Sequence, residues 1–311
     1  MSAMRVGVIG VGHLGRHHAR LLAAMDGVDL VGVVDIAADR AAAIAAEHGT
    51  RARTAAGLLG AVDAVSVAVP TEAHEAVARP FLEAGVAVLV EKPMADSLAA
   101  ADRLLAAASA GGAMLAVGHT ERFNPALAAA RPHITRPRFV EVHRLGTFPE
   151  RSLDIDVVFD LMIHDLDLLL ALVGSEVVGV EAVGVNVLTP RVDIANARLR
   201  FASGCIANLT ASRISRDRVR KARFFAGEAY VGVDFATQET EVYRLDRSGP
   251  APRVVGGSVP VEAAEPLGRE LEDFVAAVRE RRAPAVPGAA GRDALALATR
   301  IADQIAAAAQ V

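Results

Sequence analysis

The sequence predicts a doubly wound parallel α/β sheet over its first part and an α+β fold with a largely antiparallel, open sheet over the rest. From residue 5 to about residue 118, short β-branched runs alternate with longer alanine- and leucine-rich stretches, which is typical of a buried parallel sheet with crossover helices. After Pro125 the predicted strands follow one another with few helical interruptions. A length of 311 residues accommodates two such domains. We place them at 1–120 and 121–311, with the last helix free to pack back on the first domain.

The strands of the first domain are predicted from its most apolar segments. They cover residues 5–9, 28–35, 64–69, 86–90 and 114–117. Between them, residues 15–25 and 71–84 have the length and the apolar spacing of amphipathic helices.

The elements of the second domain are predicted from alternating patterns and turn residues. Apolar and polar side chains alternate over 195–201 and again over 205–212, and Ser203-Gly204 between them indicates the turn of an antiparallel hairpin. The other expected elements are a short helix after Pro125, a strand at 138–145, a long helix at 160–173, strands at 229–235 and 239–245, a glycine- and proline-rich loop at 248–266, and closing helices at 267–281 and 289–309.

The composition indicates a globular protein and argues against several classes. Hydrophobic residues make up 52% and charged residues 23%, so the chain has enough apolar residues to form a hydrophobic core and is not expected to be disordered. With a net charge of -4 and no basic stripe, a nucleic-acid partner is not expected. The single cysteine, Cys205, excludes an internal disulfide and fits a reducing compartment. The apolar run 6–11 is too short and too rich in glycine for a membrane span. We therefore expect a cytoplasmic protein with no membrane partner.

A glycine pattern follows the first predicted strand directly. Gly10, Gly12 and Gly15 form GxGxxG, in which the first glycine permits a tight turn, the second lets the backbone approach a pyrophosphate and the third lets helix and strand pack closely. Asp35 ends the second strand, where its carboxylate can accept both ribose hydroxyls and repels a 2′-phosphate. This combination predicts a Rossmann domain that binds NAD in preference to NADP, with Arg40 as a nearby cation that works against this preference.

Four further segments occur in a familiar order. They are Val69-Pro70-Thr71-Glu72-Ala73-His74, Glu91-Lys92-Pro93, Gly118-His119-Thr120-Glu121-Arg122-Phe123-Asn124-Pro125 and Asp160-Leu161-Met162-Ile163-His164-Asp165. Together with the glycine pattern they resemble the Gfo/Idh/MocA family of oxidoreductases over nearly the whole chain. The resemblance implies hydride transfer with NAD as cofactor, bound by Gly10, Gly12, His13, Leu14, Gly15, Asp35, Pro70, Thr71, His74, Glu91 and Lys92.

The resemblance also implies a catalytic set of Lys92, Asp160 and His164. Lys92 precedes a proline, which disfavours helix and keeps the lysine extended at the carboxyl end of a parallel strand, where ligands bind. Asp160 and His164 are four residues apart on a predicted helix, so they share a face and we expect them to point into the cleft between the domains. In isolation this spacing fits a capping aspartate and a structural histidine better. Either Lys92 or His164 can be the proton acceptor, since relatives differ in this.

The substrate expected from the resemblance is a sugar or a nucleotide sugar. The sequence is most similar to members that act on nucleotide-linked amino sugars such as UDP-N-acetylglucosamine and oxidise the 3-hydroxyl to a ketone. Besides Lys92 and His164, the candidate substrate-binding residues are Arg122 and Arg213 for a diphosphate and Asn124 for a sugar hydroxyl or acetamido group. Ion pairs are the alternative use of both arginines.

Two other functions remain open at this point. One is a dehydrogenase of free sugars or inositols, which the same catalytic set would serve. The other is a dinucleotide-binding sensor or scaffold without turnover, which the presence of all three catalytic residues disfavours. We expect no metal, because hydride transfer to a nicotinamide requires none. A homodimer or homotetramer is expected by family analogy.

Overall fold

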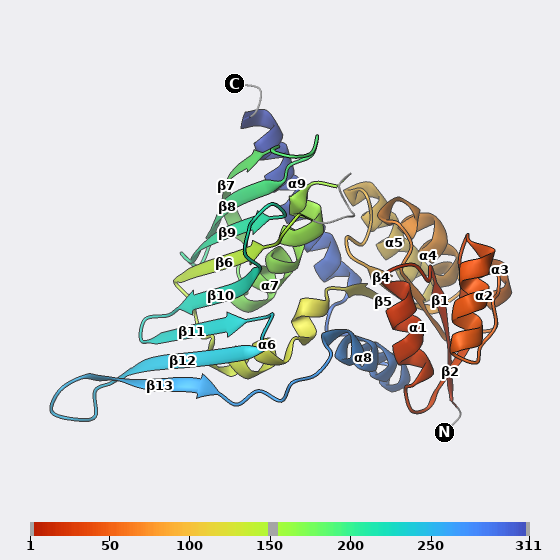
Figure 1. The fold of residues 1–311 in the computed structure, drawn as a ribbon, viewed down its shortest axis with the longest axis horizontal. Helices are drawn as coiled ribbons and strands as arrows, with labels where there is room; N and C mark the ends of the chain where they lie inside the picture. The colour runs from red at the N-terminus through yellow and green to blue at the C-terminus, as the bar shows by residue number, and fades with distance from the viewer. Residues whose placement is uncertain (1–2, 149–154, 309–311) are drawn as a thin grey trace. The chain divides into compact units, whose positions relative to one another are not determined.

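The computed structural model describes residues 3–148 and 155–308, which fall into two compact units (Figure 1). Unit 1 comprises Met1–Thr120 and Leu267–Leu295, and unit 2 comprises Glu121–Pro266 and Ala296–Val311. Unit 1 has a parallel sheet and unit 2 a mostly antiparallel one, so the predicted fold class is confirmed. The assignment of cofactor binding and substrate binding to separate domains stays a prediction.

The sheet of unit 1 has five parallel strands in the order β2-β1-β3-β4-β5. A parallel bridge between Val33 and Ala52 extends it beyond β2. With Ala52 counted as a further strand, the order is the 3-2-1-4-5-6 of dinucleotide-binding sheets. All five predicted strands are confirmed, with small shifts at their ends: β1 is Met4–Ile9, β2 Val28–Val34, β3 Ala64–Val67, β4 Ala87–Glu91 and β5 Leu115–Gly118.

The helices of unit 1 connect consecutive strands. The predicted helices at 15–25 and 71–84 are confirmed, the second beginning with a 3-10 turn. Ser97 caps α5 by accepting a hydrogen bond from the Ala100 amide at 3.3 Å, and Gly112, whose φ is +63°, follows the last residue of the helix. The elements are α1 Gly15–Ala23, α2 Ala38–Glu47, α3 Ala55–Leu58, η1 Thr71–Ala73, α4 His74–Glu83 and α5 Leu98–Gly111.

Two helices from the end of the chain also contribute to unit 1. The predicted second domain runs from 121 to 311, whereas the structure groups Leu267–Leu295 with unit 1. The physical reason is the apolar face of α8, Pro266–Glu280, because its Leu271, Phe274 and Val275 are buried in the core that β1 and α1 form. Helix α9, Gly288–Ala308, begins in unit 1 and ends in unit 2.

The sheet of unit 2 has eight strands in the order β13-β12-β11-β10-β6-β9-β8-β7. Only β6 and β9 pair in parallel, and β8 and β9 form the predicted hairpin. The strands are β6 Phe139–Leu145, β7 Val177–Val185, β8 Ile194–Phe201, β9 Ile206–Ser212, β10 Val219–Phe225, β11 Ala229–Asp234, β12 Glu239–Asp246 and β13 Arg253–Val259.

Three of these strands were not predicted. β7 contains two glycines and β10 contains three basic residues, which weakens the apolar alternation of both. β13 lies inside the predicted loop at 248–266, so that prediction is wrong over Arg253–Val259. This edge strand is held by its backbone pairing with β12. Most of its side chains are exposed, so it lacks the buried apolar side chains from which a strand can be predicted.

The helices of unit 2 pack on its sheet. α6, Pro125–Ala130, contacts β11 and β12, and the π-helical turn η4, Val158–Met162, contacts β9 and continues into α7, Ile163–Val173. Two 3-10 turns, η2 (Thr120–Phe123) and η3 (Arg131–His133), flank α6. In the last part of α9, Arg300 and Gln304 donate to backbone carbonyls of β7 at 3.2 and 2.9 Å. No helix in the described part of the chain is both long and apolar enough to span a membrane.

Glu270 of α8 is a buried acid in unit 1, with only 2% of its surface exposed. Burial raises the pKa of its carboxyl well above the ordinary value, and the negative charge of Glu91 raises it further. A group of this kind binds its proton more tightly in the folded chain than in the unfolded one. Its contribution to the free energy of unfolding is therefore present below the unfolded pKa and is lost as the pH rises through the folded pKa.

Replacing Glu270 by glutamine should raise stability at alkaline pH. The amide has nearly the same shape as the acid and never ionises. We therefore expect Glu270→Gln to unfold a few degrees above the wild type at pH 9, because each kcal/mol of stability raises the melting temperature by about 2–4 °C. At pH 5 it should unfold at the same temperature as the wild type or slightly below it. Thermal unfolding followed by circular dichroism at both pH values measures this. Glu272→Gln, an exposed position on the same helix, is the control. An identical pH dependence in wild type and Glu270→Gln would contradict the prediction.

Candidate functional site

The glycine loop of unit 1 has the geometry of a phosphate cradle. Gly10 has a φ of +85°, and a Cβ there would lie 2.6 Å from the carbonyl oxygen of Ala68. A Cβ on Gly15, the first residue of α1, would overlap the carbonyl oxygen of Gly10. At Gly12, by contrast, no atom of the described residues beyond its two chain neighbours lies within 4 Å of the Cβ position. The loop thus leaves open space beside its backbone at the start of a helix, which suits a pyrophosphate.

Asp35 links the end of β2 to this loop. Its carboxylate accepts the backbone amides of Val11 and Ala37, both at 2.9 Å, and the Nε and Nη2 of Arg40 at 3.0 and 2.6 Å. Burial favours the neutral acid, but the hydrogen bonds from Arg40, Ala37 and Val11 outweigh it and hold the pKa of Asp35 below its ordinary value. Asp35 is therefore an ionised carboxylate whose oxygens each receive two donors. Of these donors, only Arg40 is an exposed side chain that can move away.

The other candidate cofactor residues divide into accessible and buried ones. His13, Leu14 and Pro70 are exposed and Thr71 is half-buried, so a ligand can reach them. Glu91 and His74 are 7% and 1% exposed, and both bond to groups of unit 1 itself. Direct contact of Glu91 or His74 with a cofactor stays a prediction.

Lys92 directly follows the last residue of β4, as expected for the carboxyl end of a parallel strand. Its side chain is half-buried, and the peptide bond to Pro93 is cis. The glycine loop follows β1, Asp35 follows β2 and Pro70 comes shortly after β3. Because the strands are parallel, all of these lie at the same edge of the sheet, where ligands bind in this class of fold.

Asp160 and His164 lie in unit 2 on the predicted helix, but its first turn is wider than expected. Asp160 belongs to the π-helical turn η4 and His164 to α7, and both are half-buried. π-Helical turns are rare and occur often at functional sites. The helix was correctly predicted, whereas no residue pattern in it indicated the π turn.

Two buried ion pairs fix the helix that carries His164. Asp165 receives the Nε and Nη2 of Arg144 at 2.9 and 2.7 Å, and Arg144 also donates to Glu121 at 2.8 Å. Asp167 receives the Nε and Nη2 of Arg122 at 2.6 and 2.7 Å. Losing one partner of such a buried pair typically costs about 3–5 kcal/mol, because the other charge is left uncompensated. Arg144 was not among the residues that the sequence analysis singled out.

The structure gives the candidate substrate residue Arg122 an ion pair with Asp167, which is the alternative use expected for such an arginine. Asn124 is 2% exposed and works within the fold: it caps α6 by accepting the Ala126 amide at 3.1 Å and donates to the carbonyl of Phe235 at 3.1 Å. Substrate contact by either residue stays a prediction.

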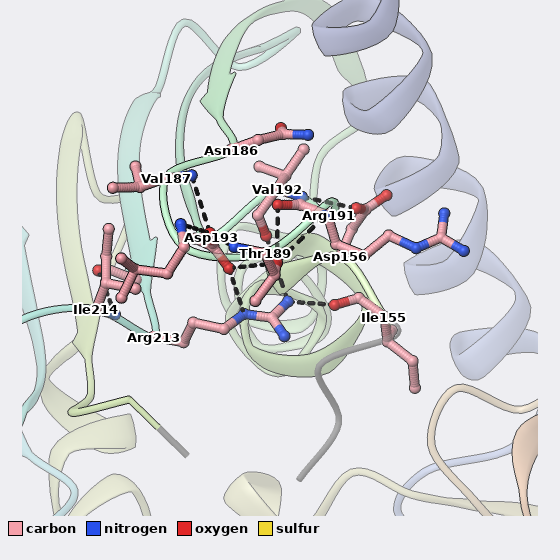
Figure 2. Close-up of polar contacts among 12 residues, drawn as sticks. Ile155, Asp156, Asn186, Val187, Thr189, Arg191, Val192, Asp193, Arg213 and Ile214 are labelled. Carbon is pink, nitrogen blue, oxygen red and sulfur yellow. Dashed lines mark hydrogen bonds and ion pairs between the residues drawn. The ribbon is translucent and has the colours of Figure 1, made fainter. Parts of the chain in front are cut away.

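Arg213 is also buried within unit 2, with 2% of its surface exposed. Figure 2 shows its polar contacts. Its guanidinium donates to the carbonyls of Ile155 and Val192 and lies 3.6 Å from Asp193. Asp156 accepts the Val192 amide at 2.9 Å, so this cluster holds the segment just before η4. A phosphate-binding role for Arg213 stays a prediction.

The carboxylate of Asp193 organises the loop between β7 and β8 (Figure 2). One oxygen accepts three successive backbone amides, those of Val187, Leu188 and Thr189, at 2.7–2.9 Å, and the other accepts the Thr189 hydroxyl at 2.7 Å. Burial opposes ionisation, but these hydrogen bonds lower the pKa of Asp193 to about 2. Among the described residues, no cluster of three or more histidine, cysteine or acidic side chains could hold a metal.

Two family models match the chain. The first, described as oxidoreductase family, NAD-binding Rossmann fold, matches residues 4–119, and the second, described as GFO/IDH/MocA C-terminal domain, matches residues 130–230. The chain belongs to the Gfo/Idh/MocA family of oxidoreductases. As a Gfo/Idh/MocA member it carries the family's NAD-binding domain in unit 1, and the open space at Gly12 and the ionised Asp35 fit that dinucleotide.

Individual relatives agree with the family assignment. The chain is 43% identical to the UDP-N-acetylglucosamine 3-dehydrogenase of Acidithiobacillus ferrooxidans, over 97% of both chains. A solved structure of that enzyme superimposes with a TM-score of 0.93 over 99% of both chains. The inositol 2-dehydrogenase of Rhizobium meliloti is 30% identical over 68% of this chain and 69% of the relative.

Removing Arg40 should sharpen the preference for NAD in this Gfo/Idh/MocA member. The Arg40 guanidinium bonds to both oxygens that ribose hydroxyls would use, and its positive charge offsets the repulsion between Asp35 and a 2′-phosphate. For Arg40→Leu we expect the Kd of NAD to fall by about two- to fivefold, the scale of an exposed ion pair, and the Kd of NADP to rise. Isothermal titration calorimetry with both dinucleotides measures this.

The matched control for this experiment is Arg103→Leu. Arg103 is another exposed arginine of unit 1 that binds a carboxylate through Nε and Nη2, here Glu75 at 2.6 Å for both bonds. Its loss should leave both affinities unchanged. Weaker binding of NAD to Arg40→Leu would show that Arg40 assists the dinucleotide and does not compete with it for Asp35.

Proposed function

We propose that the chain oxidises the 3-hydroxyl of a nucleotide-linked amino sugar to a ketone, with UDP-N-acetylglucosamine as the first choice of substrate and NAD as the hydride acceptor. The observation that carries this proposal is the 43% identity to a UDP-N-acetylglucosamine 3-dehydrogenase over 97% of both chains. All three residues of the implied catalytic set, Lys92, Asp160 and His164, are present. Binding without turnover would not require them.

The proposed chemistry removes a hydride from carbon and a proton from oxygen. NAD, when bound, supplies the hydride acceptor. We assign the proton to His164, because imidazole has a free electron pair near neutral pH, whereas a lysine ammonium can only donate. Lys92 then donates a hydrogen bond to the hydroxyl oxygen, and the negative charge of Asp160 favours the imidazolium that forms.

The residues proposed for cofactor binding are those of the carboxyl edge of the unit 1 sheet. The glycine loop would hold the pyrophosphate and Asp35 the ribose, once Arg40 has moved aside. Of the three further substrate candidates, Arg122 keeps the most exposed side chain, at 16%, and we propose it for the diphosphate. For the buried Asn124 and Arg213 we propose a supporting role, since Asn124 caps α6 and Arg213 donates to the carbonyls of Ile155, just before η4, and of Val192.

We also propose that the enzyme acts as a homodimer or homotetramer in the cytoplasm. The single cysteine supports a reducing compartment. In the sheet of unit 2, the polar side chains of β8 that alternate with its buried ones are exposed, which leaves this part of the sheet available to a second copy: Asn196, Arg198 and Arg200.

The substrate is tested by following NAD reduction with a panel of alcohols. We expect kcat/KM for UDP-N-acetylglucosamine to exceed that for free N-acetylglucosamine and for myo-inositol by about a hundredfold or more, because the diphosphate adds charge-assisted hydrogen bonds. Product analysis should locate the ketone at carbon 3. If myo-inositol is turned over and UDP-sugars are not, the result would instead support an inositol dehydrogenase. If NAD binds tightly but no alcohol is turned over, the proposed reaction would be left without support.

The proposed catalytic roles are tested by Lys92→Met and His164→Ala. Each should lower kcat by about 10²–10⁴, the usual contribution of a proton-transfer group, while the Kd of NAD changes by less than about threefold. Lys221→Met is the matched control, because Lys221 is the only other lysine of the chain and pairs with Asp234 on the unit 2 sheet. Near-normal turnover in the Lys92→Met, His164→Ala double variant would refute the assigned roles.

A further inference from the structure

Two buried histidines of unit 1 bond to the residues on either side of Lys92. His18, on α1, contacts Glu91, and His74, at the start of α4, contacts Pro93. Both histidines are almost fully buried, at 0% and 1% exposure. Buried imidazoles are held in a fixed orientation by such bonds, so each forms a rigid link between elements that are distant in sequence.

On the amino-terminal side of Lys92, the link runs through the Glu91 carboxylate. His18 Nε2 lies 3.1 Å from Glu91 Oε1, and the backbone amide of Lys92 donates to Glu91 Oε2 at 3.2 Å. The other ring nitrogen, Nδ1, lies 2.8 Å from the Ser66 hydroxyl. Burial favours the neutral acid, but the hydrogen bond and charge of His18 outweigh it and keep the pKa of Glu91 low. An ionised Glu91 thus ties the Lys92 backbone to α1.

On the carboxyl-terminal side, the link runs through the carbonyl of Pro93. His74 Nδ1 lies 3.0 Å from this oxygen, and Nε2 lies 3.0 Å from the carbonyl oxygen of Val69. Burial lowers the pKa of His74, which favours the neutral ring with a single N–H. Both partners accept, so the ring donates to one of them at a time. The positioning role proposed below requires that proton on Nδ1, donated to Pro93, and the two His74 variants test it.

We propose that His18 and His74 are positioning residues that set the backbone of Lys92, an inference that rests on the catalytic role proposed for Lys92. The two links join the segment to the helix that starts at the glycine loop and to the segment that follows Pro70. The position of Lys92 is thereby fixed relative to the same elements that would hold the dinucleotide. Small displacements of a reacting group are costly, so a loosened segment should lower turnover and leave dinucleotide binding intact.

His18 contacts the Lys92 segment through Nε2 and His74 contacts it through Nδ1. The same pair of substitutions should therefore have opposite effects at the two positions. An asparagine amide nitrogen lies near the Nδ1 position of histidine, and a glutamine amide nitrogen near Nε2. At position 18, His18→Gln keeps a donor toward Glu91 and His18→Asn loses it. At position 74, His74→Asn keeps a donor toward Pro93 and His74→Gln loses it.

We expect kcat to fall by about tenfold or more in His18→Asn and His74→Gln, and to be at least about threefold higher in the donor-keeping variant at the same position, His18→Gln or His74→Asn. KM for NAD and the thermal midpoint should be similar within each pair. Two variants at one position that lose kcat equally, in step with the thermal midpoint, would show a packing role and overturn the proposal. Each position is decisive alone, so a variant that does not fold leaves the other pair to give the answer.

A second measurement separates this proposal from the catalytic role of Lys92. In the Lys92→Met background, His18→Asn and His74→Gln should cause no further loss of kcat if they act through Lys92. A full additional loss in that background would overturn the positioning role and leave the proposed role of Lys92 standing. If Lys92→Met alone keeps normal turnover, the proposed function of Lys92 fails first, whatever the histidine variants do.

Discussion

The approach of α1 to the carbonyl oxygen of Gly10 is the constraint on which the rest of unit 1 depends. Only a glycine at position 15 permits it, because any Cβ would overlap that oxygen. The contact brings the start of α1 onto the end of β1, so the open backbone at Gly12 lies beside a helix N-terminus. One turn further along the same helix, His18 reaches Ser66 and Glu91. The glycine loop and the Lys92 segment are therefore placed by the same steric contact.

The parallel sheet could be predicted from the sequence because its strands are buried on both faces and therefore appear as continuous apolar runs. The strands of unit 2 were predictable only where alternation was clear, as in β8 and β9. β10 was missed because its exposed face carries Lys221 and Arg223, whose partners Asp234 and Glu141 lie on neighbouring strands. Pairing of this kind is a property of the folded sheet, and no local pattern indicates it.

The positions of the glycine loop, Asp35 and Lys92 could be predicted, since they follow strand ends that the sequence shows, whereas their roles in binding and catalysis stay predictions. The contacts that support them could not be predicted, because they join residues far apart in the chain. Arg144 offered a usable signal: it continues the alternation of Val140 and Val142 on the buried side of β6, and a buried arginine needs carboxylates. The sequence could not identify Glu121 and Asp165 as those partners.

The loop held by Asp193 has a consequence for the effect of substitutions far from η4. Three successive amides that converge on one point form the kind of nest that binds phosphate in other proteins, and here the chain fills it with its own carboxylate. The nest is thus an internal receptor with a built-in ligand. A substitution at position 193 would be felt first just before η4, through Val192 and Asp156, so the position of the turn that carries Asp160 depends on a loop that is distant from it in the sequence.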